Sequence, residues 1–318
     1  MKKKYLLVVV LSCLLSLLCR EFYSQEYPFE IQWILVFTSI IYFLPIIFSL
    51  IVDKQLFDNL TISRSKVSLY IMVLLSPYLL AFLISDKATA SPGINIGFIG
   101  LWAAFALCAQ LFNKIRDWLI LALILSIWFA FELDLFVLWN GSLYFLNVLL
   151  GIDLVIIIFP LFLNFRPFVI QFKISHLRTK YLHYYGGIFL ILAIPYGLLS
   201  GFLELKSSID IMQIPIQFLA IFFFNALPEE ILFRGLLQQQ AQRYMHEHLA
   251  LFLVSIAFGF AHLNNYPMWD YRFVIVSFVA GICFGVVYLR TRAIAPAALL
   301  HTIINTTNAI VFDKVPLI

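Results

Sequence analysis

Long apolar runs repeat along almost the whole length of this chain, and no other feature restricts its possible folds as strongly. A helix needs about 17–25 predominantly apolar residues to cross a bilayer, and about eleven stretches meet that length. They lie near residues 5–22, 29–52, 67–85, 93–112, 117–138, 143–164, 184–203, 214–240, 249–264, 272–290 and 293–312. We therefore predict an all-α fold, a polytopic transmembrane helix bundle of about 10–11 spans.

The composition agrees with a protein that lies in lipid. Of the 318 residues, 63% are hydrophobic and 12% are charged, whereas a typical soluble domain is about 25% charged. One water-soluble core could not hide so much apolar surface, so we expect the lipid bilayer to be a partner and the cell membrane to be the location. The net charge of +4 is small and forms no basic stripe, so we expect no nucleic acid partner.

Basic residues predict the orientation of the spans. Lys2, Lys3 and Lys4 precede the first run, which places the N-terminus in the cytoplasm. That run resembles a signal peptide, but no small-x-small cleavage site follows it, so we expect an uncleaved first span. The longest polar stretch, 166–185, is expected to be a cytoplasmic loop. It divides the chain into an N-terminal multi-span region, 1–183, and a C-terminal membrane domain, 184–318.

Ionisable residues inside the apolar runs need a reason, because each costs about 2.5–3.5 kcal/mol at membrane depth. In the N-terminal region, Asp153 lies inside a run, and we expect a partner on another helix. The C-terminal region carries three polar pairs, each four residues apart. They are Glu230 with Arg234, Phe258 with His262, and His301 with Asn305.

The first pair predicts a structural ion pair beside a reactive acid. Residues four apart share a helix face, and Arg234 needs a carboxylate because it keeps its charge, so we assign Glu230 to it. Glu229 points about 100° away from that face. We therefore expect it to act as a general base or acid. Pro228 precedes the acids and is expected to kink the segment.

The other two pairs complete a set that suffices for peptide hydrolysis if the three helix faces converge. Glu229 with His262 could bind and deprotonate a water. His301 and Asn305 could donate to the oxyanion that forms, and each such donor is worth about 2.7–4 kcal/mol in measured cases. Phe258 would form an aromatic wall beside His262. The alternative is a purely structural role, in which these polar groups only hold neighbouring helices together.

The pattern Glu-Glu-x-x-x-Arg, Phe-x-x-x-His and His-x-x-x-Asn resembles the CAAX protease and bacteriocin-processing family, also called CPBP or Abi, and its type II CAAX prenyl endopeptidases. The resemblance covers roughly residues 184–312. It implies an intramembrane glutamic-type endopeptidase in which Glu229, His262, His301 and Asn305 are catalytic. Glu230, Arg234 and Phe258 would support the site. The substrate would be a peptide or membrane protein, possibly lipidated, such as a prenylated CAAX protein.

Two other functions remain open. Glu229, His262 and His301 could be three zinc ligands with an open position, which would make a metalloendopeptidase, although the sequence has no HExxH motif. We expect no cofactor, with zinc as the possible exception. The second alternative is a non-catalytic membrane protein, such as a bacteriocin-immunity factor or a proton-coupled carrier. A carrier would more often show broken helices in two matching halves, and the chain has no such symmetry.

Overall fold

The computed structural model describes residues 2–23, 27–51, 64–84, 89, 92–157, 159, 180–265, 267 and 269–316. The chain forms two compact units, Met1–Arg166 and Pro167–Ile318. Within the described residues, seven helices are long and apolar enough to cross a membrane, and shorter apolar helices accompany them. The prediction of an all-α polytopic bundle is thereby confirmed, and the chain is a multi-pass membrane protein. The orientation of its N-terminus remains a prediction, as does the predicted domain boundary at 183.

The N-terminal unit is built from apolar helices. In its described part these are α1 (Lys2–Tyr23), α2 (Phe29–Ile51), α4 (Arg64–Ile84), α5 (Pro92–Leu111), α6 (Arg116–Glu132) and α7 (Tyr144–Ile157). Helix α1 packs against α2, α5 packs against α6, and α7 packs against α2. They coincide with the predicted apolar runs, but among the described residues only α1 and α2 of this unit are long and apolar enough to span a membrane by themselves.

Two buried polar side chains of α7 have very different surroundings. Asn147 is fully buried and fixes the turn that precedes the helix. Its Oδ1 accepts from the backbone N–H groups of Leu138 and Trp139, and its Nδ2 donates to the carbonyl of Trp139, at 2.8, 2.9 and 2.9 Å. Asp153 is also fully buried, but within the described residues neither of its carboxyl oxygens has a hydrogen-bond partner. The expected partner on another helix is therefore not found in the part of the chain that the structure describes.

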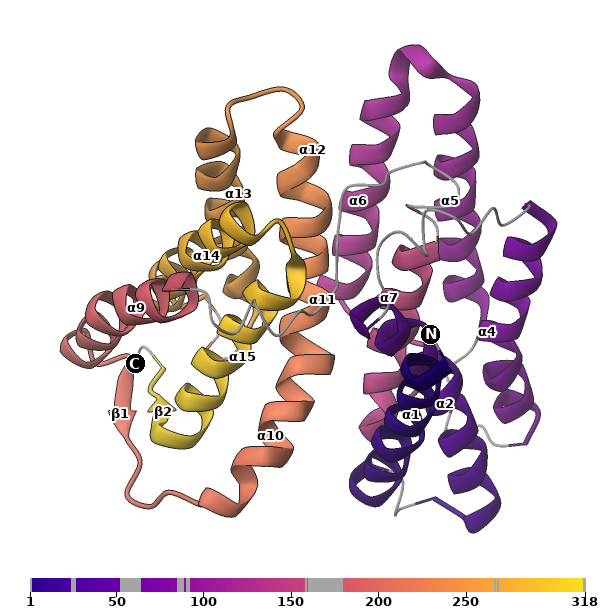
Figure 1. Ribbon diagram of the computed structural model, residues 1–318, viewed down its shortest axis with the longest axis horizontal. Coiled ribbons are helices and arrows are strands. Elements are labelled where there is room, and N and C mark those ends of the chain that lie inside the picture. Colours follow the sequence, from indigo (N-terminus) through magenta and orange to yellow (C-terminus); the bar gives the residue numbers. More distant parts are fainter. Residues whose placement is uncertain are drawn as a thin grey trace. The chain divides into compact units, whose positions relative to one another are not determined.

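The C-terminal unit holds the three predicted motifs. Its helices are α9 (Lys180–Leu199), α10 (Ile214–Ile221), α11 (Leu227–Glu230), α12 (Gln239–Ala241), α13 (Glu247–Ala261), α14 (Tyr271–Thr291) and α15 (Ile294–Val311). Figure 1 shows α10, α11 and α12 as consecutive parts of one long helical segment, and residues 211–241 together form one candidate span. Helix α14 packs against α9, α13 and α15, and α15 packs against α10 and α11. This packing brings α11, the end of α13, and α15 together.

The long segment does not keep α-helical winding around the two acids. Two π-helical parts, η5 (Phe222–Ala226) and η6 (Ile231–Gln238), flank α11. Pro228 lies at the start of α11, where it supplies no backbone N–H to the helix. We predicted a kink at this proline, and the structure shows altered winding on either side of it. Such π-helical insertions are frequent at functional sites.

A short β-pairing was not predicted. Strand β1 (Leu203–Leu205) pairs antiparallel with β2 (Phe312–Lys314), and Leu203 lies opposite Lys314. Gly201, which has a φ of +68°, forms the turn before β1. Arg272 links the residues beside the two strands, because its guanidinium donates to the carbonyls of Ser200, before β1, and Val315, after β2, at 3.1 and 2.7 Å. The pairing thereby fixes the position of the residues that follow α15.

Candidate active site

The first motif forms an ion pair inside the C-terminal unit. The Nε of Arg234 lies 3.0 Å from Oε2 of Glu230, and both side chains are completely buried. The guanidinium also lies over the ring of Phe258, 5.1 Å from its centroid. A buried guanidinium needs both a carboxylate and further favourable contacts. Glu230 supplies the carboxylate, as its i, i+4 spacing from Arg234 indicates, and Phe258 supplies a contact from another helix.

His301 links this pair to the second acid. Its Nδ1 lies 3.1 Å from Oε1 of Glu230, and its Nε2 lies 3.9 Å from Oε2 of Glu229. Its ring stacks on Phe284, with the centroids 4.5 Å apart. Because a carboxylate only accepts hydrogen bonds, Nδ1 carries a proton and donates to Glu230. The other ring nitrogen, Nε2, is thereby directed toward Glu229.

Asn225 connects the first and third motifs, and the sequence analysis gave it no role. Its Nδ2 donates to Oε1 of Glu229, and its Oδ1 accepts a hydrogen bond of 2.8 Å from Nδ2 of Asn305. Asn225 precedes Glu229 by four residues, so the same helical spacing that identified the other pairs could have indicated it. Its contact with Asn305, 80 residues away, required the fold.

His262 approaches the same region from α13. Its Nδ1 lies 2.8 Å from the carbonyl oxygen of Phe258, so Nδ1 carries the proton and Nε2 of the neutral ring is an acceptor. The ring of Phe258 contacts both histidines, with its centroid 4.8 Å from that of His262 and 5.8 Å from that of His301. His262 also meets Phe273 edge to face at 5.0 Å.

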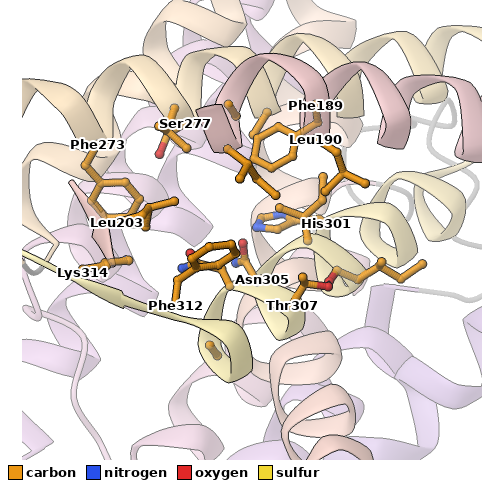
Figure 2. Close-up of a pocket in the computed structure, with 18 of the residues that line it drawn as sticks. Phe189, Leu190, Leu203, Phe273, Ser277, His301, Asn305, Thr307, Phe312 and Lys314 are labelled. Atoms are coloured by element: carbon orange, nitrogen blue, oxygen red, sulfur yellow. The ribbon is translucent and has the colours of Figure 1, made fainter. Parts of the chain in front are cut away.

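A cavity of about 640 Å³ opens beside these groups. Asn225, His262, His301 and Asn305 line it, together with mostly apolar side chains of α9, α14 and α15. Figure 2 shows His301 and Asn305 in the middle of the lining, with Phe189 and Leu190 above His301. Glu229 is not among the lining residues, but it contacts two of them, Asn225 and His301. A cavity of this size suits a small molecule or a short peptide.

Two lysines outside the predicted motifs also line the cavity. Lys206 donates to the carbonyl of Ala309 at 2.7 Å and forms an ion pair of 3.7 Å with Asp313. Lys314, the last residue of β2, has its Nζ over the ring of Phe273, 3.7 Å from the centroid. Burial lowers the pKa of the Lys314 amine to about 8, and the negative charge of Glu229 opposes that shift. The amine is therefore mostly protonated at neutral pH.

The zinc alternative requires Glu229, His262 and His301 to lie around one point. Among the residues that the structure describes, no three of the types His, Cys, Asp and Glu are grouped so that they could hold a metal ion. Glu229 and His301 approach each other, but the described arrangement does not add His262 to them as a third ligand. The zinc alternative and the expectation of no cofactor both remain predictions.

The comparisons with known proteins concern this same part of the chain. Residues 211–307 match the Rce1-like family model, described as type II CAAX prenyl endopeptidase Rce1-like. No curated protein and no solved structure matches the chain. The family match contains α11, α13, α14 and most of α15, and so all three motifs. It confirms the family resemblance predicted from them and supports a CAAX protease-type endopeptidase in the membrane.

Proposed function

We propose, from the premise that residues 211–307 form a type II CAAX prenyl endopeptidase-like segment, that the C-terminal unit is a glutamic-type intramembrane endopeptidase. It hydrolyses a peptide bond near the C-terminus of a membrane-associated substrate of the CAAX type. The single observation that carries this proposal is the network in which Glu229 contacts both Asn225 and His301, beside a cavity that His262 and Asn305 also line.

The two acids differ in what surrounds them, and this difference supports separate roles. Glu230 is completely buried between Arg234 and His301, so it holds the site together. Glu229 is 24% exposed at its side chain and contacts polar groups that line the cavity. A carboxylate held beside the polar lining of a cavity can act as a general base on a water that enters there. We therefore assign the removal of a proton from the attacking water to Glu229.

His262 supports the removal of a proton from the attacking water. Its Nδ1–H donates to the carbonyl of Phe258, so the lone pair of Nε2 can accept a different hydrogen bond. Because His262 lines the cavity, Nε2 can accept a hydrogen bond from the attacking water. Glu229 and His262 together would orient the water and take its proton, which passes afterwards to the leaving amine.

The third motif supplies donors for the oxyanion. Asn305 uses one N–H of its amide on Asn225, and the second N–H remains for a substrate carbonyl. His301 donates to Glu230 from Nδ1, so it can donate from Nε2 only when the ring is protonated. Donors placed where negative charge develops lower the barrier of acyl transfer.

The test is cleavage of a fluorogenic prenylated CAAX peptide by the purified full-length protein in liposomes. Glu229→Gln keeps the shape of the side chain but removes the base, so we expect cleavage to fall by about 10²–10⁴-fold, the usual contribution of a general base. His262→Ala should cause a loss of the same kind. Glu247→Gln changes a glutamate that is 40% exposed at the far end of α13 and serves as the matched control, with unchanged cleavage.

Each variant is measured with and without a strong chelator. Cleavage by the wild-type protein that the chelator leaves intact and Glu229→Gln abolishes is the expected result. Loss of cleavage on chelation that added zinc restores would contradict the metal-independent mechanism while keeping the peptidase. Absence of cleavage by the wild-type protein, for prenylated and unprenylated peptides alike, would overturn the proposed function.

A further inference from the structure

The C-terminal strand β2 brings a positive charge into the cavity from outside the segment that carries the three motifs. Lys314 lies seven residues beyond the end of the family match, at 307, and it lines the same cavity as His301 and Asn305. Figure 2 shows it at one end of the cavity, beside Leu203 and Phe273. The β1–β2 pairing and the hydrogen bond from Arg272 to Val315 hold the backbone on both sides of it.

Lys314 differs from Lys206, the neighbouring cavity lysine, in that no ion pair joins it to an acid among the described residues, although the charge of Glu229 attracts it from beyond ion-pair distance. Lys206 is occupied by Asp313 and the carbonyl of Ala309. For Lys314 the contact described is with the face of the Phe273 ring, and no ion pair joins it to the described acids. An ammonium group at an apolar wall gains little there compared with a carboxylate. The charge is thus available to an anion that enters the cavity.

The anion that fits best is the end of a peptide. Lys206 and Asp313, which pair with each other, also line this end of the cavity, and Leu203, Phe273 and Phe312 supply apolar surface near Lys314, so a ligand with aliphatic or aromatic side chains and one terminal charge suits it. The cavity of about 640 Å³ holds only a short stretch of chain. A peptide whose scissile bond lies at Asn305 and His301 therefore has its end only a few residues away, since each extended residue spans about 3.3–3.6 Å.

We propose that Lys314 is the specificity residue that binds the C-terminal carboxylate of the substrate, and so restricts cleavage to bonds a few residues from a free chain end. This inference rests on the proposed function. The ammonium group donates to the terminal carboxylate, and Phe273 holds the lysine side chain in place. A lipid phosphate is a less suitable ligand because the catalytic side chains line the same cavity.

The experiment compares two forms of the same prenylated CAAX peptide, one with a free C-terminal carboxylate and one with a C-terminal amide. We expect the wild-type protein to cleave the acid with a kcat/KM about 10- to 100-fold above that of the amide, the range for a charged hydrogen bond. Lys314→Gln should lower kcat/KM for the acid alone and remove this preference. Lys314→Arg keeps a cation and should retain part of it. Lys206→Gln changes the other cavity lysine and should leave the ratio as it is.

The outcomes separate this inference from the function on which it rests. A wild-type protein that cleaves acid and amide equally well would overturn the role of Lys314 and leave the endopeptidase intact. The same holds if Lys314→Gln lowers both rates by one factor, which would show a structural role in the β1–β2 pairing. A wild-type protein that cleaves neither form would overturn the proposed function and this inference together.

Discussion

Asp153 in the N-terminal unit and Glu230 in the C-terminal unit are both completely buried carboxyls, and they have opposite surroundings. Glu230 contacts Arg234 and His301 at about 3 Å, while Asp153 has no hydrogen-bond partner in the described part of its unit. Burial of a charge is costly unless it is paired. The comparison teaches that burial alone does not identify a site. What distinguishes Glu230 is that it contacts an arginine on its own helical segment and a histidine on α15.

The largest effect expected from this comparison is on stability. Glu230→Gln leaves the guanidinium of Arg234 buried without its carboxylate, so we expect a loss of about 3–5 kcal/mol in the free energy of unfolding. Asp153→Asn removes a buried carboxyl that has no cation to lose, and we expect no loss of stability. Thermal unfolding of both variants in the same detergent measures the difference. Equal losses for the two variants would break the comparison.

A second difference concerns two asparagines, one in each unit. Asn147 satisfies backbone groups in a buried turn, whereas Asn225 satisfies the side chains of Glu229 and Asn305. We expect Asn147→Ala to cost about 1–3 kcal/mol of stability, because buried backbone groups lose their partner. Asn225→Ala should instead lower kcat by about 10- to 100-fold, the range for one hydrogen bond to a charged group.

Unfolding midpoints and peptide cleavage rates, measured for both asparagine variants, separate the two roles. Asn225→Asp adds a charge beside Glu229 and should not restore the rate. If Asn225→Ala unfolds earlier but cleaves at the normal rate once folded, Asn225 is structural and the site as described is wrong in that respect.

The sequence was enough to locate the structural pair, because Glu230 and Arg234 lie on one helix and their spacing alone places them together. The convergence of α11, α13 and α15 could only be hypothesised from three motifs that each needed a partner. Asn225 was missed although it lies four residues before Glu229, since one polar residue near a helix start has many ordinary explanations. Lys314 could not be found at all. Its position depends on the pairing of 203–205 with 312–314, and three-residue strands leave no periodic pattern in a sequence.

Helix packing offers a smaller test. A Cβ at Gly259 on α13 would lie 2.9 Å from the backbone oxygen of Val274 on α14, whereas a Cβ at Gly100 on α5 would meet nothing within 4 Å. Gly259→Ala therefore forces two backbones apart, and we expect a loss of about 1–3 kcal/mol. Gly100→Ala should be neutral or slightly stabilising, because alanine favours the helix. Because His262 follows on the same helix, Gly259→Ala should also slow cleavage, whereas Gly100→Ala should not.

The smallest effect concerns the left-handed residue that follows one helix in each unit. Helix α6 is followed by Asp134 with a φ of 50°, and α14 by Arg292 with a φ of 53°. Glycine adopts this left-handed conformation at less cost than other residues. At each position we expect the glycine variant to be more stable than the alanine variant by about 0.5–1 kcal/mol.

The comparison of glycine with alanine removes the contribution of side-chain contacts, because both variants lose them. Arg292 pairs with Glu247 in a largely exposed position, and Asp134 accepts a hydrogen bond from Tyr144. Unfolding midpoints of the four variants give the two differences directly. If the differences agree, the backbone follows the same rules in both units, and the contrast between Asp153 and Glu230 arises from side-chain partners alone. If the glycine advantage is absent in one unit, the backbone there is held by more than its helix end, and the contrast between the units extends beyond their buried polar groups.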